Sequence, residues 1–200
     1  MKRRCHAALA LAVALTTPAC TSLLPKTPPS HFYVLSASDE RASATQAIAI
    51  GVGPVQLPPY TDRPQIVVRT GPNAISFEET RRWATPLQQA VTSVLMIDLG
   101  RRLGTDRVTA FPFALGLPRD YDVSVDFFHF EPDSSGAVLV EALWRIQDSA
   151  TGGERVVRRS RLDRSTPPGD FAAASAALSD ALGELAAEIA VAVEQVRIAR

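Results

Sequence analysis

Few side chains of this protein are of the types that form a reactive centre, and their spacing argues against one. The 200 residues include three histidines and two cysteines, which are scattered along the chain. There is no Gly-x-Ser-x-Gly turn for a nucleophilic serine and no His-Glu-x-x-His pair for zinc. Asp126 and His129 point to opposite faces of a regular strand, so only a bulge would bring them together around a metal. We therefore expect a protein that is not an enzyme and holds no cofactor.

Cys20 differs from these residues because the chain before it predicts a chemical modification. Residues 1–19 begin with basic side chains, continue with an apolar run from Ala7 to Leu15 and end in small residues. This order is typical of a secretory signal. The apolar run has about 10 residues, whereas a membrane-spanning helix needs roughly 20. We therefore expect residues 1–19 to be a signal peptide that is removed.

The junction Ala19-Cys20 resembles the lipobox of bacterial lipoproteins, whose cysteine is acylated and becomes the new N-terminus. Thr17 stands where that box usually has leucine, and the alternative is an ordinary signal that leaves a free Cys20 thiol. The Pro-rich stretch 20–30 is then an extended tether that reaches roughly 30 Å. Neither residue after Cys20 is aspartate, which is the inner-membrane retention signal of such proteins. The resemblance thus implies a lipid anchor in the outer membrane, with the domain on the periplasmic face.

The rest of the chain has the composition of one nearly neutral globular domain, which we place at residues 31–200. Without the signal, 18 basic and 21 acidic side chains remain, so nucleic acid is not an expected partner. Cys5 leaves with the signal, and acylation of Cys20 leaves no thiol for a disulfide. Packing alone must therefore stabilise the fold.

Apolar periodicity predicts eight strands and two long helices in this domain. The first helix has Thr85 as N-cap, Pro86 at its first position, Gln88 completing a capping box and Gly104 at its end. The second helix begins at Phe171 and is rich in alanine. The strands are expected at 31–35, 47–55, 65–69, 74–77, 107–110, 121–127, 138–146 and 154–164. This order predicts an α+β single domain with a mainly antiparallel sheet and both helices on one face.

Two strand segments carry patterns with more than one interpretation. The glycines of 51–53 could belong to a phosphate-binding loop, but that motif needs a third glycine and a helix, so a bulge or close strand contact is favoured. In the second segment, Asp122, Asp126 and Glu131 are interpreted as the solvent side of a half-exposed strand. The alternation breaks at 127–129, which predicts a bulge there.

Five arginines fall within ten residues of the last expected strand: Arg155, Arg158, Arg159, Arg161 and Arg164. Guanidinium groups pair with phosphates and carboxylates, so this strip could contact lipid headgroups or an acidic partner protein. The alternative, which we favour, is an exposed edge strand whose charges discourage edge-to-edge aggregation.

Four short segments stand in a distinctive order after the signal. They are His-Phe-Tyr-Val-Leu (31–35), Val-Gly-Pro-Val-Gln-Leu-Pro-Pro-Tyr (52–60), Arg-Trp-Ala-Thr-Pro-Leu (82–87) and Glu-Ala-Leu-Trp-Arg-Ile (141–146). Their order and spacing, over roughly residues 31–197, resemble the PqiC-like, or ABC-type transport auxiliary, lipoproteins. Trp83, Pro86 and Trp144 are the family-like structural positions. Trp144 is also in phase with a buried strand face, and Trp83 could pack on the helix start.

The resemblance implies a lipoprotein that works with an MCE-domain (mammalian cell entry type) transport system, which moves lipids or other hydrophobic molecules between the inner and outer membranes. It supplies no catalytic residues. Ring-shaped MCE partners are compatible with a homo-oligomer by symmetry matching. The alternatives are an outer-membrane assembly or envelope-scaffold lipoprotein without a transport role, and a periplasmic hydrolase. The hydrolase would need a serine or aspartate with a base beside it in a cleft.

Overall fold

The computed structural model describes residues 28–43, 47–114 and 116–199. The expected signal, Cys20 and the tether up to residue 27 lie outside the described residues and stay predictions. Along the described residues the elements are β1 (His31–Tyr33), β2 (Ile50–Gln56), η1 (Pro59–Thr61), β3 (Gln65–Gly71), β4 (Ala74–Trp83), α2 (Leu87–Leu103), β5 (Val108–Ala110), β6 (Tyr121–Pro132), β7 (Ala137–Asp148), β8 (Glu154–Ser165) and α3 (Phe171–Ile198). Every expected strand and helix is therefore present, with ends displaced by a few residues.

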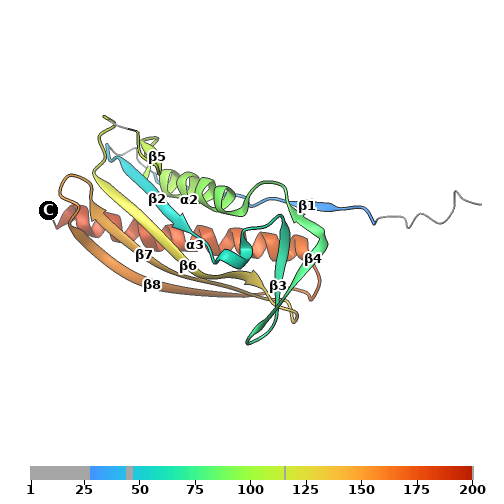
Figure 1. Ribbon diagram of the computed structural model, residues 1–200. Coiled ribbons are helices and arrows are strands. Elements are labelled where there is room, and N and C mark those ends of the chain that lie inside the picture. The colour runs from blue at the N-terminus through green and yellow to red at the C-terminus, as the bar shows by residue number, and fades with distance from the viewer. Residues whose placement is uncertain (1–27, 44–46, 115, 200) are drawn as a thin grey trace, which may run out of the picture.

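The strands form two sheets, both of mixed direction (Figure 1). The larger sheet has the order β5-β2-β6-β7-β8, and the smaller has β1-β4-β3. The α+β prediction is confirmed, but the sheet is mixed rather than mainly antiparallel. The meander β6-β7-β8 is antiparallel, as expected, whereas β2 is parallel to both β5 and β6. The long connection through β3, β4 and α2 returns the chain to the end where β2 began, which is what a parallel pair requires.

The two long helices lie side by side against the larger sheet (Figure 1). Helix α2 packs on β2 and β5, and α3 packs on β6, β7 and β8. Leu178, Leu182, Leu185, Ile189 and Val193 recur at helical spacing along α3, and all five are buried against the sheet and α2. Trp144 of β7 is fully buried in the same core, and Trp83 at the end of β4 is also buried. Packing therefore accounts for both family-like tryptophans.

The start of α2 differs from the expected capping box. Pro86 is the N-cap itself, and no side chain caps the first turn. The side-chain amide of Gln88 instead donates to the carbonyl oxygen of Val55, at 2.9 Å, and so fastens α2 to β2. The other end is as expected, since Gly104 closes the helix in the left-handed conformation with φ of 61°.

The glycines of β2 serve strand contact and not phosphate binding. The β2–β6 register shifts between Val52 and Val55, which is the irregularity that the sequence favoured. A Cβ atom added at Gly51 would lie 2.2 Å from Oδ1 of Asp122 in β6 and 2.8 Å from the ring of Phe113, so glycine lets these two side chains lie close against β2. A second shift lies between Phe127 and His129, which confirms the bulge expected in β6.

Candidate functional site

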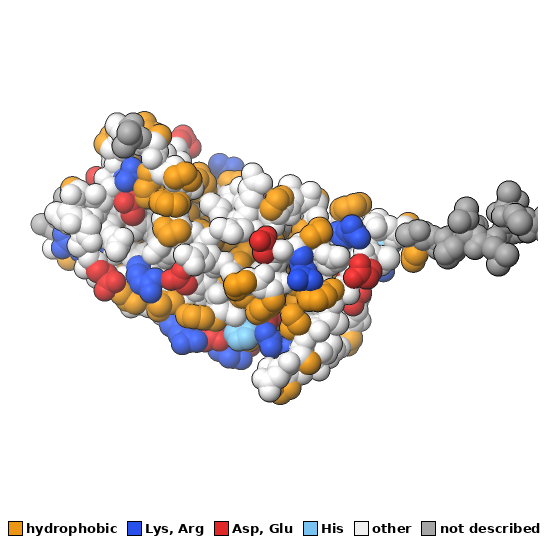
Figure 2. Space-filling model, in the orientation of Figure 1, with side chains coloured by type: hydrophobic (Ala, Val, Ile, Leu, Met, Phe, Trp, Pro, Cys, Tyr) orange, Lys and Arg blue, Asp and Glu red, His pale blue; other side chains and the backbone are white. Residues whose placement is uncertain are grey.

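The arginine strip lies where the sequence placed it, on β8 at the edge of the larger sheet. Most of its arginines form ion pairs with carboxylates of the same chain. Arg155 pairs with Asp148 at 3.1 Å, and Arg159 and Arg161 reach Glu141 at 2.6 and 3.6 Å. Basic and acidic side chains accordingly alternate along this side of the molecule (Figure 2).

Arg158 has a different environment from its neighbours on β8. Its guanidinium lies 5.9 Å from the ring centroid of Trp144 and 3.5 Å from the side-chain oxygen of Gln195. No carboxylate pairs with it among the described residues. Arg158 is thus the member of the strip best able to pair with an external phosphate or carboxylate.

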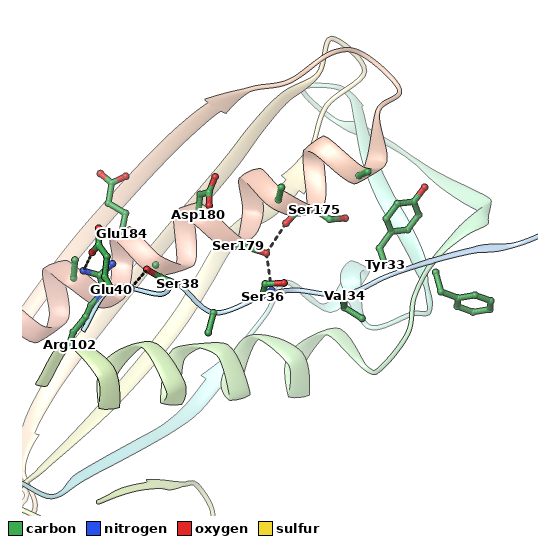
Figure 3. A pocket seen from close by; sticks show the side chains of 16 residues that line it. Tyr33, Val34, Ser36, Ser38, Glu40, Arg102, Ser175, Ser179, Asp180 and Glu184 are labelled. Carbon is green, nitrogen blue, oxygen red and sulfur yellow. Dashed lines mark hydrogen bonds and ion pairs between the residues drawn. The ribbon is translucent and has the colours of Figure 1, made fainter. Parts of the chain in front are cut away.

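A groove of about 800 Å³ runs between α3 and the segment 32–40, which leads from β1 toward α2 (Figure 3). Its floor is a face of α3 with the exposed side chains of Ala172 and Ala176 and, between α3 and the segment, the buried Gly183. Its other wall is the extended segment itself, whose Phe32 and Val34 side chains are exposed. This groove lies beside the point where the tether enters the domain, and we take it as the candidate functional site.

Hydrogen bonds fasten the segment 33–43 to both helices. The Ser36 N–H donates to Ser179 Oγ of α3, at 3.1 Å, and the Ser38 N–H donates to Asp98 Oδ1 of α2, at 2.7 Å (Figure 3 shows the serine contact). The Arg101 guanidinium donates to the Ser38 carbonyl oxygen, and Arg102 pairs with Glu40 at 2.5 Å. The segment after the tether is therefore an integral part of the domain.

Asp98 is the buried charge in this attachment. Its residue surface is 1% exposed, and Oδ2 has no hydrogen-bond partner within the described residues. Burial raises the pKa of the Asp98 carboxyl, and the Ser38 N–H and the nearby Arg102 and Arg101 oppose this rise only in part.

We expect Asp98→Asn to change how stability depends on pH while keeping the fold, because asparagine still accepts from Ser38 but cannot ionise. The folded-state pKa of Asp98 is raised, so its contribution to stability is fully present below the unfolded pKa and is lost as the pH rises through the folded pKa. As the pH rises from about 4 to 7, the melting temperature of the variant should therefore increase relative to that of the wild type. Circular dichroism melts at both pH values measure this gain, and a constant difference would contradict the prediction.

The two α3 serines of the groove, Ser175 and Ser179, are engaged by the backbone of α3. Ser175 and Ser179 donate their hydroxyl protons to carbonyl oxygens one turn earlier in α3, at 2.8 Å each. No histidine, lysine or cysteine stands beside them in the lining. Over the described chain, no group of three or more histidine, cysteine, aspartate or glutamate side chains is placed to hold a metal ion.

A cluster of polar side chains around Glu131 joins the two sheets, and it shows that the prediction for Glu131 was wrong. Glu131 was expected on the solvent side of β6, but its side chain is only 2% exposed. It pairs with Arg69 of β3 at 2.7 Å, accepts from Tyr60 at 3.0 Å and lies 2.9 Å from His129 Nδ1. Burial, followed by the Glu131 charge, raises the pKa of Tyr60 to about 12. The bulge thus turns His129 toward Glu131, while Asp126 pairs with Arg145 at 2.6 Å.

A family model matches residues 33–190, from β1 to the last turns of α3. Its description is "ABC-type transport auxiliary lipoprotein component". The chain belongs to this family. Membership indicates a lipoprotein of the cell envelope that is associated with a membrane and serves a transport system. Within the described residues, no helix combines the length and apolarity needed to cross a membrane.

Solved structures support the fold of the family. Protein XCC0632 of Xanthomonas campestris is 19% identical, with a TM-score of 0.69, and the match covers 82% of this chain and 98% of that one. A crystal structure of an uncharacterized protein, also 19% identical, has a TM-score of 0.68 over 82% of this chain and 99% of its own. These likenesses are evidence for the fold alone. No functionally curated protein matches the chain.

Proposed function

We propose that this protein is a lipid-anchored, non-catalytic component of an MCE-type transport system that moves lipids or other hydrophobic molecules between the two membranes. Acylated Cys20 holds it on the periplasmic face of the outer membrane, where the domain docks the transport assembly. Family membership supports the transport role. The MCE partner and the outer membrane follow from the resemblance of the sequence described above.

The attachment of the segment 33–43 is the observation that carries this proposal. Here the backbone after the tether is bound by Ser179 of α3 and by Asp98 and Arg101 of α2. The tether therefore joins the domain at its β1 end, and the groove, the β8 edge and the far end of the molecule are available to partners. A homo-oligomer would match the symmetry of a ring-shaped partner.

The full chain, extracted from membranes in mild detergent, tests this proposal. Intact mass spectrometry should show a chain that begins at Cys20 and carries two or three acyl groups, and an unmodified chain would overturn the anchor. The same preparation should retain the MCE-domain subunit of the transport system on affinity purification. An acylated, folded protein that retains no such subunit would overturn the transport role and favour the envelope-scaffold alternative.

A further inference from the structure

Two large apolar side chains are exposed on the extended segment that follows the tether. The inward side chains of this segment are Tyr33, Leu35 and Ala37, which pack on the core. Figure 3 shows Tyr33 and Val34 on opposite sides of the backbone. The outward side chains Phe32 and Val34 are 65% and 63% exposed, at positions where a half-exposed extended segment ordinarily has polar residues. We call Phe32 and Val34 the apolar pair, and large apolar side chains exposed together mark an interaction surface.

The backbone that carries the apolar pair is held on both sides. In the smaller sheet β1 is parallel to β4, and the Ala84 N–H donates to the Tyr33 carbonyl oxygen at 2.9 Å. The Tyr33 ring lies 6.4 Å from that of Phe171, the first residue of α3, between centroids. Because Tyr33 occupies the inward side, its two neighbours are kept facing out of the domain.

The charged groups beside the apolar pair suit an anionic surface. Phe32 lies opposite Arg82 in the β1–β4 register, and Arg81 is the preceding residue of β4. Neither arginine forms an ion pair with a carboxylate among the described residues, and each donates to an uncharged oxygen of β4, at 3.3 and 3.0 Å. Positions 28–34 and 80–86 include no acidic residue. Apolar side chains with arginine beside them are typical of segments that enter the headgroup region of a bilayer.

Acidic side chains limit the extent of this surface. Asp170, just before α3, is engaged as the helix cap and accepts from the Ala173 N–H at 2.9 Å. Asp180 and Glu184 lie farther along α3 in the groove. Toward the β3–β4 turn, the first acidic residue of β4 is Glu79. The part of the surface that an anionic leaflet attracts is therefore confined to the β1 end, around the apolar pair.

The expected anchor keeps the same end of the domain near a membrane. Phe32 is the twelfth residue after Cys20, so the chain between them spans at most about 43 Å. A short tether of this kind gives a contact an effective concentration in the millimolar range. Two side chains are too few for a protein interface, which needs about 800 Å² on each side. They suffice for a bilayer contact, because the lipid anchor supplies the association and the contact has only to orient the domain.

We propose that the apolar pair inserts into the surface of the membrane that anchors Cys20, with Arg81 and Arg82 against the lipid phosphates. This inference rests on the proposed function and adds the orientation of the domain on the membrane. The β1 end faces the bilayer, and the 28 residues of α3 extend about 42 Å from it. The end of the molecule that carries β5 then points into the periplasm (Figure 1).

The test measures bilayer contact by tryptophan fluorescence in the acylated, full-length protein. Phe32→Trp is reconstituted in vesicles of phosphatidylethanolamine and phosphatidylglycerol that also contain phosphatidylcholine brominated on its acyl chains, which quenches tryptophan on contact. The emission that this variant adds to that of the wild type should fall by at least about half, because the side chain reaches the acyl boundary. The native Trp83 and Trp144 are buried and give a constant background. Phe111→Trp is the matched control, since Phe111 is 53% exposed in the loop after β5, at the opposite end from β1, and its emission should not change.

Flotation of the same vesicles separates failure of the contact from failure of the anchor. Protein that floats with the vesicles but is quenched no more at position 32 than at position 111 would overturn the contact and leave the proposed function intact. Emission at position 32 that is shifted to the blue without quenching would show that protein covers the apolar pair, and would also overturn it. A chain that carries no acyl group and does not float would instead count against the proposed function.

The arginines are tested in the Phe32→Trp background. Arg81→Gln combined with Arg82→Gln should lower the quenching by about half in vesicles that contain phosphatidylglycerol, because two attractions to the anionic surface are lost. In vesicles without anionic lipid the same substitutions should have little effect. Equal quenching with and without the two arginines in the anionic vesicles would overturn their part in the contact.

Discussion

Glu131→Gln is expected to destabilise the protein by about 2–4 kcal/mol, because it removes one charge of a buried ion pair and leaves the Arg69 guanidinium without its carboxylate. Oε1 of Glu131 accepts from Arg69 and lies close to His129, and Oε2 accepts from Tyr60 and from the Phe130 N–H at 2.7 Å. Glutamine can keep only some of these acceptor roles and brings two new donors. The melting temperature of the full chain should fall by roughly 5–15 °C.

Asp126→Asn is the matched control for this substitution. Asp126 is an acidic residue of the same strand, and it pairs with Arg145, but both side chains are about one-third exposed, at 33% and 31%. Solvent screens such a pair, so the cost should stay below about 1 kcal/mol. Thermal unfolding in the same detergent, followed by far-ultraviolet circular dichroism, measures both variants. Equal losses would show that Glu131 behaves as a surface charge and not as the link between the two sheets.

The elements with strong local periodicity could be predicted from sequence, and α3 is the clearest case. Its apolar stripe is set by residues three and four apart, so no knowledge of distant parts of the chain is needed. The turn at 133–136 is equally local, since Asp133 Oδ1 accepts from the Ser135 and Ala137 N–H groups within the turn itself. The β6–β7 hairpin follows from that turn and from the alternation on either side of it.

The direction of β2 was harder to predict because its partners are distant in the sequence. Ile50 lies opposite Val108 on one side and Tyr121 on the other, both in parallel register. A signal did exist in the sequence, because residues 48–52 (Ile-Ala-Ile-Gly-Val) contain no alternating polar side chains, which is typical of strands covered on both faces. The structure buries all five residues. The antiparallel expectation gave too much weight to the hairpins that follow.

The buried carboxyl groups of Asp98 and Glu131 could be found from the sequence only in part. Asp98 stands among the buried positions of α2, with Val94, Leu95 and Leu99, so an acid on an apolar helix face was the available signal. Glu131 gave none, since it alternates correctly for a solvent-facing residue of β6. It is buried because Arg69 and the hairpin β3–β4 fold across that end of the sheet, which is a tertiary event.

Gly136→Ala is expected to be at least as damaging as the loss of Glu131, because two separate effects add at this position. Gly136 has a φ of 88°, a conformation that costs an L side chain about 1–3 kcal/mol. An added Cβ would also lie 2.1 Å from the Thr166 carbonyl oxygen and 3.0 Å from the Pro168 nitrogen. Both atoms are backbone, so no side-chain rotation relieves the contact.

The hydrogen bonds between Gly136 and Thr166, which the substitution would disrupt, link two connecting segments of the fold. The Gly136 carbonyl oxygen accepts from the Thr166 N–H and hydroxyl, at 2.8 Å each, and so ties the β6–β7 turn to the start of the link between β8 and α3. Gly152→Ala separates the two effects, since Gly152 also has a positive φ, of 68°, but no atom within 4 Å of an added Cβ. We expect a loss of about 1–2 kcal/mol for Gly152→Ala and about 3–5 kcal/mol for Gly136→Ala. Thermal melts of both variants measure these losses of stability. Similar losses for the two variants would mean that the backbone around Gly136 can move away from Thr166 at little cost and that this contact does not hold α3 against the sheet.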